Sequence, residues 1–101
     1  MSKNLIITRH PAAVEFLESF GITGDVHPHA TDDLVRGRRV YGVLPMNLAC
    51  LTDEYYAIEM DMAADMRGKE LTLGDMERMN ARVVRYKVSS HGSMKRYQVE
   101  P

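Results

Sequence analysis

The chain has little cysteine, little net charge and no long apolar run. Cys50 is the only cysteine among 101 residues, and thirteen Lys and Arg against fourteen Asp and Glu give a formal net charge of −1. This balance argues against binding of long nucleic acid through a wholly basic surface. No apolar run approaches the roughly 20 residues that span a bilayer, and the first residues lack the pattern of a secretory signal. We therefore expect a cytoplasmic protein with no membrane partner.

The length predicts one domain over residues 1–101. A chain of this size buries very roughly 60–70% of the surface that it exposes when unfolded, which is enough for a true core. Residues 87–101 form a C-terminal extension with a Ser-Ser-His-Gly-Ser run. That extension is either a small hairpin or a partly disordered end.

Strand and helix patterns alternate along most of the chain. The expected order is a strand over 4–8, a helix from Pro11 that ends before Gly21, a short extended segment over 25–29, a polar surface loop over 31–39, a central strand over 40–44, a short helix over 46–51 and a strand over 55–62. The run over 40–44 is almost continuously apolar, which is typical of a strand covered on both faces.

A last helix is expected from Thr72 to Tyr86. Thr72 and Asp75 have capping-box spacing, and the apolar residues that follow recur at helical intervals. The arginines of this segment should form a basic stripe along the helix, most simply a solvated face. They are Arg78, Arg82 and Arg85.

Strands separated by short helices predict a mostly parallel sheet in a small three-layer α/β sandwich. Ligands of such sheets bind beyond the carboxyl ends of the strands. Three loops should meet there, over 8–10, 45–47 and 61–69. They bring five polar side chains toward one crevice: Arg9, His10, Asn47, Arg67 and Lys69.

Thr8, Arg9, His10 and Pro11 carry the strongest functional signal. They follow an apolar strand and open a helix, so that a guanidinium, an imidazole and backbone N–H groups meet at one helix N-terminus, which is a ready anion site. The alternative is that they are exposed cap residues. Asn47 could likewise be a plain cap, and the segment 67–69 a solvated loop whose glycine permits close backbone approach to a phosphate.

His27 and His29 place two imidazoles at positions i and i+2. On a regular strand both would face the same side and could share a metal ion, with Asp32 or Asp33 as a third ligand. The spacing matches no compact zinc pattern, so exposed histidines at a sheet edge are the simpler interpretation.

Three ordered blocks resemble a family of small CRISPR-associated accessory proteins of type III systems. The resemblance covers about 5–86, and the blocks are Thr8 to Pro11 with Ala13, then 42–49, then 67–71 leading to Asp75 and Met76. It implies a fold related to the Rossmann-like domains that sense cyclic oligoadenylate, a homodimer, and a role in antiviral defence. The family includes ring nucleases that degrade cyclic tetra-adenylate. The extension after Lys87 has no counterpart in the pattern.

The resemblance implies a cut without metal or other cofactor, in which a ribose 2′-hydroxyl attacks the neighbouring phosphate. Arg9 would stabilise the developing charge, and His10 would move a proton. Thr8, Asn47, Arg67 and Lys69 would bind the ligand. Two other hypotheses stay open: a sensor or sponge that binds the ring without cleaving it, and a metal-dependent activity through His27 and His29.

Overall fold

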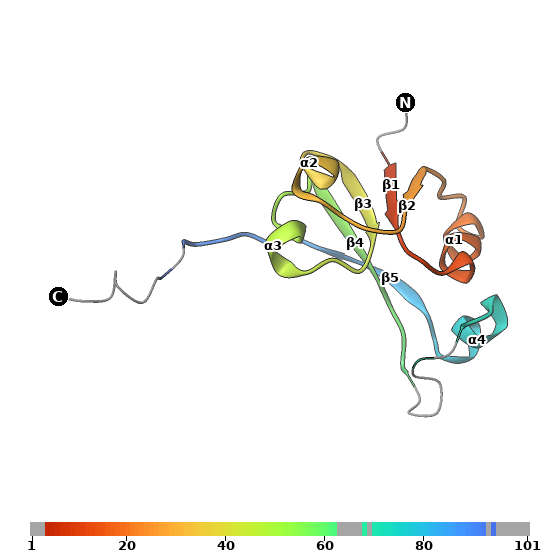
Figure 1. Cartoon of the computed structure of the whole chain (residues 1–101). Coiled ribbons are helices and arrows are strands. Elements are labelled where there is room, and N and C mark those ends of the chain that lie inside the picture. The colour runs from red at the N-terminus through yellow and green to blue at the C-terminus, as the bar shows by residue number, and fades with distance from the viewer. Residues whose placement is uncertain (1–3, 63–67, 69, 93, 95–101) are drawn as a thin grey trace.

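The computed structural model describes residues 4–62, 68, 70–92 and 94. The elements follow the order β1 Asn4–Ile7, α1 Pro11–Glu18, β2 Asp25–His27, α2 Asp32–Val35, β3 Arg39–Gly42, α3 Met46–Ala49, β4 Glu54–Glu59, α4 Leu73–Arg78 and β5 Arg82–Tyr86 (Figure 1). No helix among these residues has both the length and the apolar character needed to cross a membrane. Mixed α/β architecture is confirmed.

One five-stranded sheet has the order β2-β1-β3-β4-β5. The first four strands run parallel, and β5 pairs with β4 in the antiparallel direction. The prediction of a mostly parallel sheet is therefore confirmed, and the apolar run that begins at Val40 does form the central strand. The segment at Asp25 is a short edge strand, as its proline predicted.

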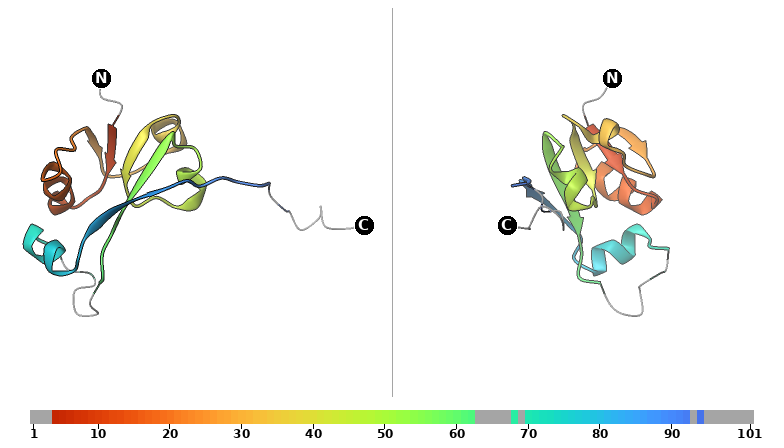
Figure 2. Two further views of the ribbon diagram at one scale, coloured as in Figure 1. Left: turned by 180° about the vertical axis from the view of Figure 1, so that it is seen from behind. Right: turned by 60° about the vertical axis from the view of Figure 1, so that its left-hand side comes forward.

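Alternate strand residues build an apolar cluster on each face of the sheet. Helices α2 and α3 cover one cluster, while α1 and α4 lie against the other (Figures 1 and 2). The first cluster contains Leu5, Ile7, Val35, Val40, Leu44, Leu48, Ala49, Tyr55 and Ala57. The second contains Ile6, Ala12, Ala13, Phe16, Leu17, Tyr41, Ile58 and Met76.

The predicted helix over 72–86 is only half correct. Thr72 and Asp75 do form a reciprocal capping box, and α4 begins there. The helix ends near Met79 because Asn80 takes the left-handed conformation, with φ 56°. The chain then turns into β5, whose β-branched pair Val83 and Val84 suits a strand. The arginines consequently lie on two different elements and form no single helical stripe.

The predicted loop over 31–39 is also wrong. Thr31 caps α2 by accepting a hydrogen bond from the backbone N–H of Leu34, and Val35 at its end is fully buried. The sequence did not predict α2 because a helix of four residues is too short to show a helical repeat of apolar residues. In the C-terminal extension, residues 87–92 and 94 contain no strand, and the rest of the proposed hairpin lies outside the described residues.

Glu54 joins three neighbouring side chains at the amino edge of the sheet. Arg39 Nε donates a hydrogen bond to its carboxylate at 2.9 Å, the Tyr56 hydroxyl donates another at 2.9 Å, and Arg85 Nη2 lies 3.3 Å away. The hydrogen bond from Arg39 and then that from Tyr56 lower the pKa of the Glu54 carboxyl below its ordinary value. This cluster ties β3, β4 and β5 together.

Gly42 should be intolerant of a side chain. It ends β3 at φ 140°, and an added Cβ would overlap the carbonyl oxygen of Ile7 on β1. We expect Gly42→Ala to lose about 3 kcal/mol or more of unfolding free energy, because backbone strain of ~1–3 kcal/mol adds to overlap of ~1–3 kcal/mol. The control is Gly21→Ala, at φ 77° with nothing near its Cβ, which should lose only ~1–2 kcal/mol. Equal losses in urea titrations of the two variants would contradict this account.

Glu54 should make stability depend on pH. Its pKa is lower in the folded state than in the unfolded chain, so its stabilisation is complete above about pH 4.3 and is lost as the pH falls through the folded pKa. We expect Glu54→Gln to be less stable than the wild type at pH 7. This difference in unfolding free energy should become smaller as the pH falls. Urea titrations between pH 3 and 7 measure it. Glu15→Gln, an exposed position on α1, serves as the control and should show no such gap.

Candidate functional site

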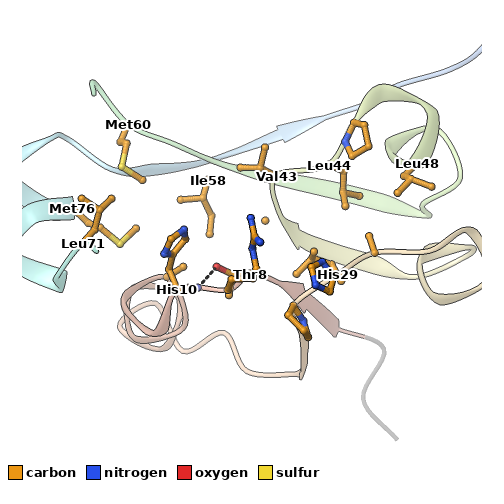
Figure 3. A pocket seen from close by; sticks show the side chains of 17 residues that line it. Thr8, His10, His29, Val43, Leu44, Leu48, Ile58, Met60, Leu71 and Met76 are labelled. Atoms are coloured by element: carbon orange, nitrogen blue, oxygen red, sulfur yellow. Dashed lines mark hydrogen bonds between the residues drawn. The ribbon is translucent and has the colours of Figure 1, made fainter. Parts of the chain in front are cut away.

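A cavity of about 540 Å³ opens at the carboxyl edge of the parallel strands (Figure 3). We call it the carboxyl-edge cavity. The segments that follow β1, β2 and β3 line it, together with residues of β4 and α4. Its lining residues are Ile7, Thr8, Arg9, His10, Ala13, Pro28, His29, Ala30, Gly42, Val43, Leu44, Pro45, Leu48, Ile58, Met60, Leu71 and Met76.

The wall of this cavity is mostly apolar. Side chains from both clusters of the core contribute to it, among them Leu44, Leu48, Ile58 and Met76. Among the described residues, only four lining side chains are polar: Thr8, Arg9, His10 and His29. The cavity therefore combines apolar walls with one permanent positive charge and two imidazoles, which suits a ligand with both a flat apolar part and an anionic part.

Local hydrogen bonds fix the turn from β1 to α1. The backbone N–H of Thr8 donates to the carbonyl of His27 at 3.0 Å, and the N–H of His10 donates to the Thr8 hydroxyl at 3.1 Å. Pro11 begins the helix, where its missing N–H costs nothing. His10 is the N-cap residue in an extended conformation, and its side chain caps no backbone group. Thr8 therefore positions the backbone that carries Arg9 and His10.

His10 has an acidic neighbour across the cavity mouth. Its Nδ1 lies 3.7 Å from Oε1 of Glu70, and both side chains are more than half exposed. An ion pair between such exposed groups is weak. It nevertheless links α1 to the segment that leads into α4, on the side of the cavity where Leu71 and Met76 lie (Figure 3).

The structure brings three of the predicted site residues together. Thr8, Arg9 and His10 all line the cavity. Asn47 does not: it is exposed on α3, and its backbone carbonyl accepts a hydrogen bond from the Cys50 thiol at 3.2 Å. Arg67 and Lys69 were also predicted here, and they lie outside the described residues.

His29 is a lining residue that the sequence assigned to a different role. Strand β2 already ends at His27, so the alternation that would place both imidazoles on one strand face does not reach His29. Only His29 lines the cavity. Across the described ranges, no group of three or more His, Cys, Asp or Glu side chains is placed to hold a metal ion. The position of His29 beyond a parallel strand was the signal that could have found it.

Comparison with known protein families gives a match over most of the chain. The family model described as "Putative CRISPR-associated protein (Cas_VVA1548)" matches residues 5–89. No curated protein and no solved structure shows significant similarity to the chain. The matched range contains every described helix, every described strand apart from Asn4 at the start of β1, and every residue that lines the carboxyl-edge cavity.

Proposed function

The chain belongs to this family of CRISPR-associated proteins, and from that premise we propose that it is a ring nuclease that binds and cleaves cyclic tetra-adenylate. Cleavage would switch off the signalling of a type III system in the cytoplasm. The observation that carries the proposal is the carboxyl-edge cavity, where Arg9 and His10 stand at the rim of an apolar chamber. An adenine base suits such walls, and a phosphate suits the guanidinium.

The proposed reaction needs no metal and no added nucleophile. A ribose 2′-hydroxyl attacks the adjacent phosphorus in line, the bond to the 5′-oxygen breaks, and a 2′,3′-cyclic phosphate remains. Positioning and charge stabilisation account for most of the acceleration in a reaction of this kind. Arg9 offers a planar pair of donors to two phosphate oxygens, His10 exchanges a proton, and Thr8 holds the turn that presents both.

A homodimer forms part of the proposal, because a ring of four phosphates is approximately two-fold symmetric. The exposed edge of β5 is a poor interface for this purpose. Antiparallel pairing of two β5 strands about a two-fold axis would send the two cavities to opposite edges of the joined sheet. The cavity mouths themselves must therefore face each other. Val43 lines the cavity and Met46 directly follows the lining residue Pro45; with 72% and 81% of their surface exposed, the two side chains supply an apolar contact.

The finer description of the fold belongs to the same proposal. The strand order and the helices on both faces support a small Rossmann-like three-layer sandwich. Folds of this type bind ligands at the carboxyl ends of their strands, where the cavity lies. In this scheme Asn47, Arg67 and Lys69 contact the part of the ring that extends beyond the cavity.

Arg9→Ala should abolish cleavage and leave the fold intact. The side chain is exposed, so its removal should change the melting temperature little, while loss of the charge that meets the phosphate should lower the rate by about 10²-fold or more. Chromatography of cyclic tetra-adenylate after incubation with protein measures the rate. Arg36→Ala, an exposed arginine outside the cavity, is the matched control and should cleave like the wild type.

The same assay separates the alternatives. Tight binding by the wild type with the ring left intact would support a sensor or sponge and remove the enzyme. Turnover that stops in chelator and returns with a transition metal would support the metal-dependent activity. Full turnover by Arg9→Ala would show that the assignment of Arg9 is wrong.

Replacing Val43 and Met46 with glutamate should separate the dimer. Four carboxylates at one apolar contact would repel one another, while the exposed positions should leave the monomer folded. Sedimentation velocity should show a dimer for the wild type and a monomer for the double variant. Met94→Glu changes a methionine that is 78% exposed and lies beyond β5, and it should remain dimeric. A monomeric wild type would refute the proposed assembly.

A further inference from the structure

We propose that His29 is a second acid–base group of the same cavity, which completes with His10 a two-imidazole arrangement around Arg9. The inference rests on the proposed function, and it concerns a residue that the family match does not single out. Cleavage by a 2′-hydroxyl requires one proton to leave the attacking oxygen and one to reach the departing oxygen. A site with two imidazoles can perform both transfers, whereas His10 alone would have to perform them in turn.

The fold places the two histidines just beyond the carboxyl ends of neighbouring strands. His10 follows β1 by three residues and His29 follows β2 by two, and these strands pair in parallel. The hydrogen bond from the N–H of Thr8 to the carbonyl of His27 ties the two strand ends together at 3.0 Å. Figure 3 shows Thr8 between the labelled His10 and His29, and all three line one cavity.

No other described side chain of the cavity can exchange a proton near neutral pH. The hydroxyl of Thr8 is too weak an acid, and the guanidinium of Arg9 keeps its proton. His29 is exposed and forms no hydrogen bond or ion pair with any described residue, so its ring is available to a ligand. Arg9 and His10 line the same cavity, and the described charged or titratable residues nearest to His29 along the chain are His27 on β2 and Asp32 and Asp33 at the start of α2.

The two imidazoles take different roles. Oε1 of Glu70 lies 3.7 Å from Nδ1 of His10 and can hold a proton-bearing ring in place, so His10 is assigned as the donor. His29 is assigned as the base, which accepts the proton of the 2′-hydroxyl as that oxygen bonds to phosphorus. The bond from phosphorus to the 5′-oxygen breaks, and His10 delivers its proton to that oxygen. The products are a 2′,3′-cyclic phosphate and a 5′-hydroxyl, and proton exchange with water restores both rings.

The test compares His29→Gln and His10→Gln in single-turnover cleavage of cyclic tetra-adenylate across pH 5 to 9. The wild type should give a bell-shaped profile. Each variant should lose about 10² to 10⁴-fold in rate and one limb of the bell, while ring binding changes by less than about threefold. His29→Gln should lose the limb that rises with pH. His91→Gln, beyond β5 and outside the cavity, should keep both limbs.

A ring with sulfur in place of each bridging 5′-oxygen separates acid from base, because a thiolate leaves without protonation. It should restore the rate of His10→Gln and leave His29→Gln slow. If the wild type cleaves the ring and His29→Gln keeps the full rate and both limbs, His29 has no such role. If His29→Gln loses rate at all pH values equally, or only loses binding, the residue merely supports the cavity and the inference is wrong. A wild type that cleaves nothing would instead overturn the proposed function.

His29→Asn guards against an effect of side-chain size. Both replacements sit at an exposed position after β2, so melting temperatures should match that of the wild type. If His29→Gln and His29→Asn both lose the limb of the pH profile that rises with pH, the loss of rate is due to removal of the imidazole. A normal rate and profile in the asparagine variant would overturn the assignment.

Discussion

Parallel hydrogen bonding of β1 to both β2 and β3 is the constraint on which the rest of the structure depends. Strands that run in the same direction release their chains at one edge, so three sequence-distant segments emerge side by side there. Parallel pairing also requires crossovers over the faces of the sheet, which bury both sides of β1 and β3 under short helices. The carboxyl-edge cavity follows from that geometry, because the helices do not cover the edge itself.

Much of the sheet could be predicted from the sequence because its central strands are apolar on both sides. The prediction of a single helix over 72–86 was wrong because the apolar pattern there is compatible both with one long helix and with a helix followed by a strand. Leu73, Met76 and Met79 have helical spacing, and Val83 continues it by chance. Pairing of β5 with β4 outweighs this local periodicity, and Asn80 supplies the turn between the two elements. Tertiary pairing of this kind leaves little trace in a single sequence.

The candidate site was predictable to the extent that it is local. Thr8, Arg9 and His10 belong to one turn between a strand and a helix, so their grouping needed no knowledge of distant contacts. Asn47 and His29 are different, because whether a residue beyond a strand end faces the cavity depends on how the loop turns after that strand. The structure excludes Asn47 from the lining and includes His29. Sequence spacing alone could not decide between them.

The reversal of direction at β5 determines where the chain leaves the molecule. Arg82 pairs with Glu59 at the cavity end of β4, and Tyr86 pairs with Tyr55 at the other end. Residues after Tyr86 therefore depart from the edge opposite the cavity, as the blue segment in Figure 1 shows. A tether or fused partner attached along this segment would leave ligand entry unobstructed. In an assembly joined mouth to mouth, both such attachments would project outward.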